Sequence, residues 1–102
     1  MNYFDALQQL GNKESRKLAN NTYLNKRGEN TVAVTLHNTD ILTYHADGRV
    51  IINNGGYETN VTRDRINQFA PAGFAVKTVK RAWIAIRYGV ESLYQNGVNV
   101  AQ

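Results

Sequence analysis

Two histidines and an aspartate are the residues of this sequence that could most directly do chemistry. His37, Asp40 and His45 are close in the chain, and a His-Asp set of this kind can ligate zinc or supply acid-base catalysis. Their spacing matches no established motif, because His37 and Asp40 flank a predicted strand corner and His45 ends the next predicted strand. We expect no enzyme activity, no bound metal and no cofactor. A small hydrolase built on these three residues is kept as an alternative function.

Basic residues interleaved with aromatic residues form the stronger pattern. Lysine and arginine contact phosphates, and an aromatic ring offers a platform on which bases stack. Tight pairing of two strands around residues 80–81 would place four side chains on one face: Lys77, Val79, Trp83 and Arg87. The alternative is that Trp83 belongs to the core and the cations form a solvated surface. The residues expected to bind a partner or nucleic acid are Tyr23, Lys26, Arg27, Lys77, Lys80, Arg81, Trp83 and Arg87.

A glycine pair and two arginines are the remaining candidates for a binding role. Gly55-Gly56 precedes a predicted strand instead of a helix, so it is expected to form a turn and not a phosphate-binding loop. Arg63 and Arg65 open a predicted helix, where they could bind an acidic partner or a phosphate. The alternative is that they pair with neighbouring acids or with solvent.

The stretch 31–67 holds the elements that must position these residues. Asp47-Gly48 favours a two-residue hairpin turn with positive φ at both positions, which pairs His45 with Val50. One face of the hairpin then carries Ile41, Thr43, His45, Val50 and Ile52, and the other carries Leu42, Tyr44 and Ile51. Neither face is polar, so we expect cover on both sides, and the pattern leaves open which face is the more buried.

The flanking segments predict short strands and short helices. Apolar spacing predicts a helix over about 3–10, capped by Asn2 and ended by Gly11, and 12–21 is a candidate second helix. Another helix, over about 63–69, would be capped by Thr62 and stopped by Pro71. Strands are expected at 22–24, 31–36, 57–61 and between 74 and 87, and Asn96-Gly97 predicts a final hairpin. We therefore predict an α+β fold, a curved antiparallel β-meander or partial barrel of about seven to eight short strands with one or two short helices.

The composition is that of one globular domain. The chain has 102 residues, 42% of them hydrophobic and 20% charged, and we predict a single domain over 1–102 with a β-rich body over about 22–101. It has no cysteine, which excludes disulfides and thiolate metal sites, and no apolar run that predicts a membrane span or a signal peptide. We therefore expect a cytoplasmic protein. Its net charge of +4 favours acidic partners.

Several short segments resemble a family of small tailed-bacteriophage proteins that carries no assigned chemistry. The segments are Asn-Thr-Tyr-Leu at 21–24, Leu-His-Asn-Thr-Asp-Ile at 36–41, Asp-Gly-Arg-Val at 47–50, Gly-Gly-Tyr-Glu-Thr at 55–59 and Thr-Arg-Asp-Arg-Ile-Asn at 62–67. The resemblance extends over about residues 16–100. It implies a viral origin and no activity, because the shared residues are typical of turns, caps and strand ends.

A small phage protein without a catalytic motif is expected to act by binding. Our leading hypothesis is a non-enzymatic accessory protein of the host cytoplasm that blocks or redirects a host protein or ribonucleoprotein complex. A defence complex, in an anti-CRISPR-like role, and a nucleic-acid-handling complex are the expected classes of target. Direct nucleic-acid binding through the basic and aromatic surface is the alternative. Exposed sheet edges and the N-terminal helix also make a homodimer a candidate assembly.

Overall fold

Two helices and eight strands make up the computed structural model, which describes residues 1–101. In chain order they are α1 (Tyr3–Leu10), β1 (Ser15–Ala19), β2 (Thr22–Gly28), β3 (Thr31–Leu36), β4 (Thr39–His45), β5 (Val50–Ile52), α2 (Asn60–Phe69), β6 (Phe74–Val79), β7 (Ala82–Arg87) and β8 (Val90–Leu93). Each strand pairs antiparallel with the next one in its sheet. The predicted α+β meander is confirmed, and it is open, not closed into a barrel.

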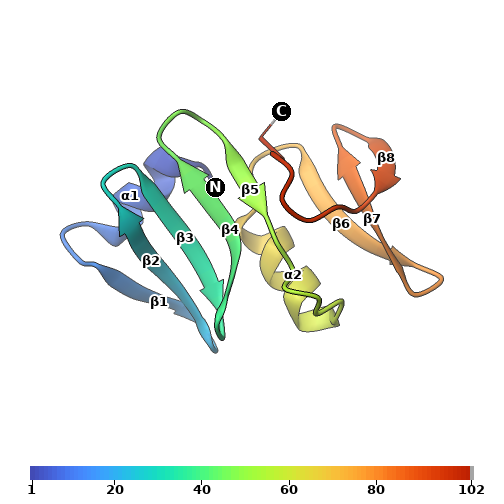
Figure 1. Cartoon of the computed structure of the whole chain (residues 1–102), viewed down its shortest axis with the longest axis horizontal. Helices are drawn as coiled ribbons and strands as arrows, with labels where there is room; N and C mark the ends of the chain where they lie inside the picture. Colours follow the sequence, from blue (N-terminus) through green and yellow to red (C-terminus); the bar gives the residue numbers. More distant parts are fainter. Residues whose placement is uncertain (102) are drawn as a thin grey trace.

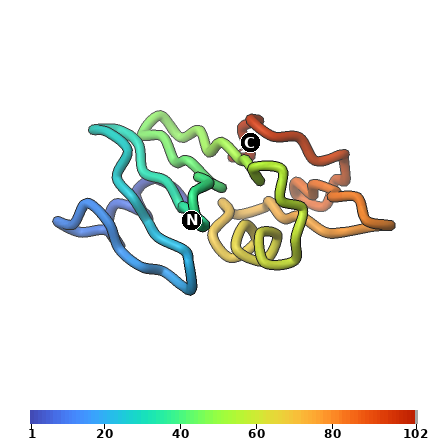
Figure 2. The backbone as a smooth tube through the Cα atoms, turned by 60° about the horizontal axis from the view of Figure 1, so that its bottom comes forward, coloured from blue at the N-terminus to red at the C-terminus, as the bar shows by residue number. Residues whose placement is uncertain are grey.

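The strands divide into two sheets that lie side by side. The first sheet has the order β1-β2-β3-β4-β5, and the second has the order β6-β7-β8. Helix α2 lies between the two sheets, and α1 lies behind β2 and β3 (Figure 1). The view turned by 60° also shows the two sheets side by side, with α2 between them (Figure 2). The extents are 42 × 26 × 17 Å, and the smallest of them leaves room for one sheet and one layer of helices.

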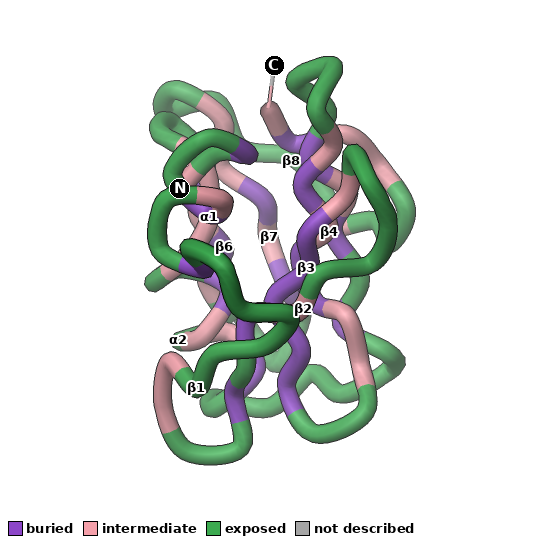
Figure 3. Tube along the Cα trace, turned by 90° about the vertical axis from the view of Figure 1, so that its left-hand side faces the viewer, coloured by how far each residue is buried: buried purple, intermediate pink, exposed green. Residues whose placement is uncertain are grey.

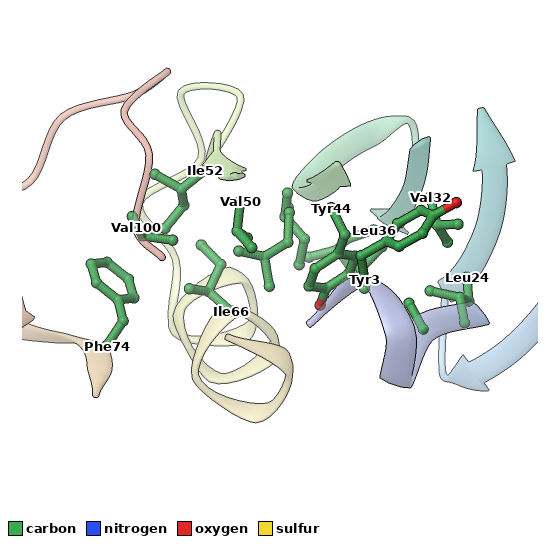
Figure 4. Close-up of a cluster of buried hydrophobic side chains, with 14 of the residues drawn as sticks. Tyr3, Leu24, Val32, Leu36, Tyr44, Val50, Ile52, Ile66, Phe74 and Val100 are labelled. Atoms are coloured by element: carbon green, nitrogen blue, oxygen red, sulfur yellow. The ribbon is translucent and has the colours of Figure 1, made fainter. Parts of the chain in front are cut away.

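The core lies between the inner face of the first sheet and the two helices. Leu24, Val34 and Tyr44 are each 0% exposed on that inner face, and Ile66 of α2 points toward Val50 (Figure 4). Burial increases from the exposed edge strand β1 to the central strand β3 (Figure 3). The Tyr44 hydroxyl donates a hydrogen bond of 2.7 Å to the carbonyl oxygen of Phe69. This contact fixes the end of α2 against the sheet.

The register of the β4–β5 hairpin differs by one residue from the predicted register. Tyr44 pairs with Val50 and Leu42 pairs with Ile52. Residues directly opposite each other share a face, so all four lie on the inner face, and each is at most 1% exposed. A one-residue shift moves side chains to the other face. The predicted distribution of apolar residues over both faces was therefore wrong.

The turn at the end of this hairpin explains the shift. Gly48 has a positive φ of 98°, whereas Asp47 has no positive φ. The Gly48 amide donates to the His45 carbonyl at 3.0 Å, and the His45 amide donates to the Arg49 carbonyl at 2.9 Å. This is a three-residue loop with a type I turn followed by a left-handed glycine. Asp-Gly serves this loop as well as the two-residue turn, and the sequence pattern does not separate the two.

Two helix predictions need correction. The candidate helix within 12–21 is instead the strand β1, whose side chains pair with β2, so sheet pairing overrides the local polar pattern. Helix α2 begins at Asn60 and not near residue 63, because Thr59 is its N-cap and accepts a hydrogen bond from the Thr62 amide at 3.2 Å. The predicted strand over 57–61 is absent. Helix α1, with the Asn2 cap and Gly11 at its end, is confirmed.

The C-terminal segment does not form the predicted hairpin at Asn96-Gly97. It returns to the first sheet, where Asn99 forms a bridge with Ile51 and the Val100 amide donates to the Val50 carbonyl at 2.8 Å. The end of the chain therefore runs beside β5 (Figure 1). This pairing covers the free edge of β5 and connects the two sheets.

The outer edge of β6 is also covered. The Asn67 side chain of α2 accepts a hydrogen bond from the Val76 amide at 2.7 Å and donates one to the Val76 carbonyl at 2.8 Å. Strands β1 and β8 are the other two sheet edges, which in the described residues are covered neither by a returning segment, as β5 is, nor by a bridging side chain such as Asn67. Neither helix within 1–101 has the length and apolar character needed to cross a membrane.

Candidate functional site

The three residues of the hydrolase alternative do not form one group, because His45 lies at the far end of β4 from His37 and Asp40. His37 is in the β3–β4 turn, with φ of 54°, and His45 is at the opposite end of β4. A strand of this length spans roughly 20 Å. Asp40 lies near the start of β4, opposite Thr35. The described residues 1–101 contain no group of three His, Asp or Glu side chains that could hold a metal ion.

Asp40 belongs to a polar network on the outer face of the first sheet. Its carboxylate accepts hydrogen bonds from Arg27 at 2.8 and 3.0 Å and from the Thr35 hydroxyl at 2.7 Å. The Thr35 hydroxyl also accepts from the Asn25 Nδ2 at 2.9 Å, and the side-chain Oδ1 of Asn25 accepts from the Ser15 hydroxyl at 2.6 Å. The bond to Asp40 raises the pKa of Arg27. Asp40 is thus engaged in linking neighbouring strands.

Trp83 is a core residue and not a stacking platform. It is 4% exposed, and its ring meets the ring of Tyr94 edge-on. The two-residue turn at Lys80-Arg81 pairs Trp83 with Thr78, which places Trp83 on the inner face of the second sheet. The predicted grouping of Trp83 with Lys77 and Val79 on one face was therefore wrong.

The basic residues of the second sheet have separate environments. The Lys77 ammonium forms an ion pair with Glu91 at 2.6 Å. Lys80 and Arg81 are exposed at the tip of the β6–β7 hairpin, and both have positive φ, 50° and 67°. Arg87 is half-buried on the same face as Trp83. Of the predicted cations, Lys80 and Arg81 are the pair that projects together into solvent.

The weaker basic and aromatic set in β2 is divided between the two faces of its strand. Tyr23 and Arg27 lie on the outer face, where Tyr23 is 41% exposed and Arg27 is bound to Asp40. Lys26 has the opposite parity and lies toward the inner side. The tyrosine and the two cations therefore do not form one surface.

The second sheet has an uncovered apolar face, which the sequence pattern did not single out. The pairing of β6, β7 and β8 places eight residues there, defined here as the outer β6–β8 face: Ala75, Lys77, Val79, Ala82, Ile84, Ile86, Glu91 and Leu93. Leu93 is 74% and Val79 is 42% exposed. Helix α2 contacts β6 from the inner side, which also holds the buried Phe74 and Val76. The signal in the sequence was the alternation of apolar residues on both parities of 74–87.

A groove opens at the other end of the first sheet, between its turns and the start of α2. Its volume is about 620 Å³, and it is lined by residues of four segments: Asn20, Asn21, Leu36, His37, Asn38, Thr39, Ile41, Asn54, Tyr57, Thr59, Val61, Thr62 and Arg65. None of the eight residues predicted to bind lines this groove. Of the two helix arginines, Arg65 lines it, whereas Arg63 does not and pairs with Asp64 at 3.3 Å, as the alternative expected. Turn and cap residues of distant segments therefore converge on one hollow.

Comparison with known proteins identifies the family of this chain. Neither the curated proteins nor the solved structures yield a match. A family profile described as Kyanoviridae Gp96 protein matches residues 4–101, which is nearly the whole chain. The resemblance to small tailed-phage proteins is thereby confirmed. The chain belongs to the Kyanoviridae Gp96 protein family of tailed bacteriophages.

Proposed function

We propose that this phage protein acts without catalysis, as an accessory protein that binds and modulates a host macromolecule in the host cytoplasm. The observation that carries the proposal is the outer β6–β8 face. Ala75, Ile84 and Ile86 are half-buried on this face, and Val79, Ala82 and Leu93 are exposed. Apolar surface of this kind marks interaction sites in small proteins. Strand β8 adds an open edge, exposed along its whole length, at which a partner strand could pair.

The chemistry of this face favours a protein partner over nucleic acid. Its central residues, Ile84 and Ile86, are aliphatic, as in the centre of protein interfaces. The one lysine of the face, Lys77, is neutralised by Glu91. Nucleic-acid binding instead depends on cations that are free to contact phosphates.

The basic tip of the β6–β7 hairpin supports the same proposal. Lys80 and Arg81 occupy two left-handed positions, which favour asparagine and glycine in hairpin turns. A non-glycine residue in this conformation costs roughly 1–2 kcal/mol. A strained turn of this kind is consistent with two cations that are retained to approach an acidic surface beside the apolar face. Host defence complexes and nucleic-acid-handling complexes are the target classes we favour, and the tip would contact an acidic protein surface of such a complex.

The test is affinity capture from host lysate with two matched variants. Leu93→Asp places a charge on the outer β6–β8 face, whereas Val90→Asp changes the same strand on the inner parity, and both positions are at least 69% exposed. We expect wild type and Val90→Asp to recover a host protein that Leu93→Asp does not recover. Recovery of no host protein, or equal recovery by both variants, would contradict the proposal.

Two further measurements separate the alternatives. Titration of labelled DNA and RNA at two salt concentrations should show no tight binding, and binding that weakens steeply with salt would favour the nucleic-acid alternative. Sedimentation velocity of wild type and Leu93→Asp tests whether the same face pairs two copies of this chain. If wild type is a dimer and Leu93→Asp is a monomer, the partner of this face is a second copy of the chain and not a host protein.

A further inference from the structure

The groove between the β1–β2 and β3–β4 turns and the start of α2, named here the α2 groove, has the dimensions of a small-molecule site. Its volume is about 620 Å³, within the range of ligand pockets, roughly 300–1,000 Å³. Leu36 and Ile41, at 6% and 0% exposure, supply an apolar floor. Asparagine, threonine and tyrosine side chains surround this floor. An apolar floor with a few polar groups is the usual composition of such pockets.

The charge of the α2 groove is positive. Arg65 is half-buried at its wall, and no aspartate or glutamate is among the lining residues. The Arg65 Nε donates a hydrogen bond of 3.0 Å to the Thr22 hydroxyl, which in turn donates to the Asn20 carbonyl at 2.8 Å. Within 1–101, Arg65 forms no ion pair with a carboxylate. Its Nη1 also donates to Gln68 Oε1 at 3.5 Å, so neutral acceptors hold the guanidinium while its charge and its Nη2 are available to an anion.

Asn54 contributes a side-chain donor that has no partner among the described residues. The residue is 3% exposed, and its Oδ1 accepts a hydrogen bond of 2.8 Å from the Gly56 amide. No described group accepts a hydrogen bond from its Nδ2. Every fully buried side-chain nitrogen or oxygen of the described residues has a partner, so Nδ2 is not fully buried. This nitrogen must therefore reach solvent, and Asn54 lines the α2 groove. It offers a hydrogen-bond donor that a ligand oxygen or nitrogen can satisfy.

Tyr57 supplies an aromatic surface on the same groove. Its side chain is 63% exposed, and its amide donates to the Asn54 carbonyl at 3.0 Å, which fixes the loop that carries it. The loop also lies close to β4, since a β-carbon on Gly55 would stand 2.7 Å from the Thr39 hydroxyl. The Tyr57 ring, exposed on a loop whose backbone is fixed, is a platform on which a planar heterocycle can stack.

We propose that the α2 groove binds a small anion that carries a planar ring, of the nucleoside monophosphate class. The phosphate lies on Arg65, the base stacks on Tyr57, and Asn54 donates a hydrogen bond to an acceptor of the ligand. A charge-assisted hydrogen bond from arginine to phosphate and stacking of a base on tyrosine are both favourable contacts. The site is separate from the outer β6–β8 face, so it does not depend on the function proposed for that face.

The test is an NMR titration of the full chain with adenosine monophosphate, uridine monophosphate, adenosine and inorganic phosphate. At least one nucleotide should shift the backbone signals of 54–65 and bind about tenfold more tightly than adenosine or phosphate alone. If neither nucleotide shifts these signals at millimolar concentration, the proposal is wrong. If phosphate alone binds as tightly as the nucleotides, the ring contributes nothing to recognition and the proposed stacking is wrong. If adenosine alone does so, the phosphate contributes nothing and the role of Arg65 is wrong.

Matched arginine variants test the assignment of the phosphate. Arg65→Gln should lower the affinity about tenfold or more, because a charge-assisted hydrogen bond is lost. Arg63→Gln, on the same helix, should leave it within about twofold, since Arg63 contacts Asp64 and Thr78 outside the groove. Equal loss in both variants would overturn the assignment.

A tyrosine variant keeps the proposal testable if Arg65→Gln does not fold. Tyr57→Ala changes an exposed side chain and should leave the thermal midpoint unchanged while lowering the nucleotide affinity about fivefold or more. An unchanged nucleotide affinity in Tyr57→Ala would exclude the stacked base.

Discussion

The indole of Trp83 packs edge-on against the ring of Tyr94, with the ring centroids 5.0 Å apart and the planes at 80°. The Tyr94 amide also donates to the Trp83 carbonyl at 3.3 Å. Tyr94 directly follows β8, lies opposite Trp83 in the β7–β8 pairing and begins the segment that returns to β5. The residue expected to stack on a ligand therefore packs inside the protein, at the point where this segment starts.

The first prediction concerns the ionisation of Tyr94. Burial raises the pKa of this phenol to about 12, above the value of about 10 in an unfolded chain. The folded state retains a proton that the unfolded state releases, so the stabilising contribution is complete below about pH 10 and is lost as the pH rises toward 12. Trp83, the single tryptophan, should lose fluorescence in a step near pH 12 as the adjacent tyrosinate forms. Tyr94→Phe should remove the step, and a step that persists in this variant would contradict the assignment.

The second prediction concerns the strained hairpin tip. Replacing Lys80-Arg81 by Asn-Gly places the preferred residues at the two left-handed positions. We expect the free energy of unfolding to rise by about 1 kcal/mol or more in urea. The same variant should bind the host partner more slowly, because the two cations are lost. A variant that is no more stable than wild type would show that the turn is not strained.

The third prediction separates two adjacent glycines. Gly55 and Gly56 both have positive φ, 64° and 85°, so alanine is strained at either position. Only at Gly55 would the new methyl group meet Thr39, whereas Gly56 has open space. Gly55→Ala should therefore destabilise the chain by about 1–3 kcal/mol more than Gly56→Ala, measured by urea unfolding. Adding Thr39→Ala should restore part of the difference, and equal effects of both glycine variants would disprove the close contact.

The fourth prediction concerns the covered edge of β6. Asn67→Ala removes two hydrogen bonds to the Val76 backbone and should cost about 1–3 kcal/mol of unfolding free energy. It also exposes a strand edge, so aggregation on heating should increase. Gln68→Ala, at the exposed neighbouring position, is the control and should stay within about 0.5 kcal/mol. If both variants behave alike, Asn67 does not protect the edge.

The position and type of many elements followed from the sequence because their signals are local. The Asn2 cap and the terminal Gly11 define α1, since capping depends on residues a few positions apart. Alternation over 31–36 predicted β3, because successive side chains of a strand point to opposite faces, although this central strand also buries Ala33 and Thr35. Short turn signals between such strands predicted the antiparallel meander. The family could also be predicted from the sequence, because the turn and cap residues that carry the resemblance lie in short contiguous segments.

Tertiary structure alone decided the register, the division into two sheets and the location of the surfaces. Asp47-Gly48 suits both a two-residue and a three-residue loop, and only the packing of Tyr44 and Val50 on the helices selects the second. Trp83 is buried against Tyr94, which the β7–β8 pairing sets opposite it. The α2 groove likewise exists because segments far apart in sequence meet in space. Such contacts depend on the whole fold, and local patterns of apolar, polar and glycine residues do not encode them separately.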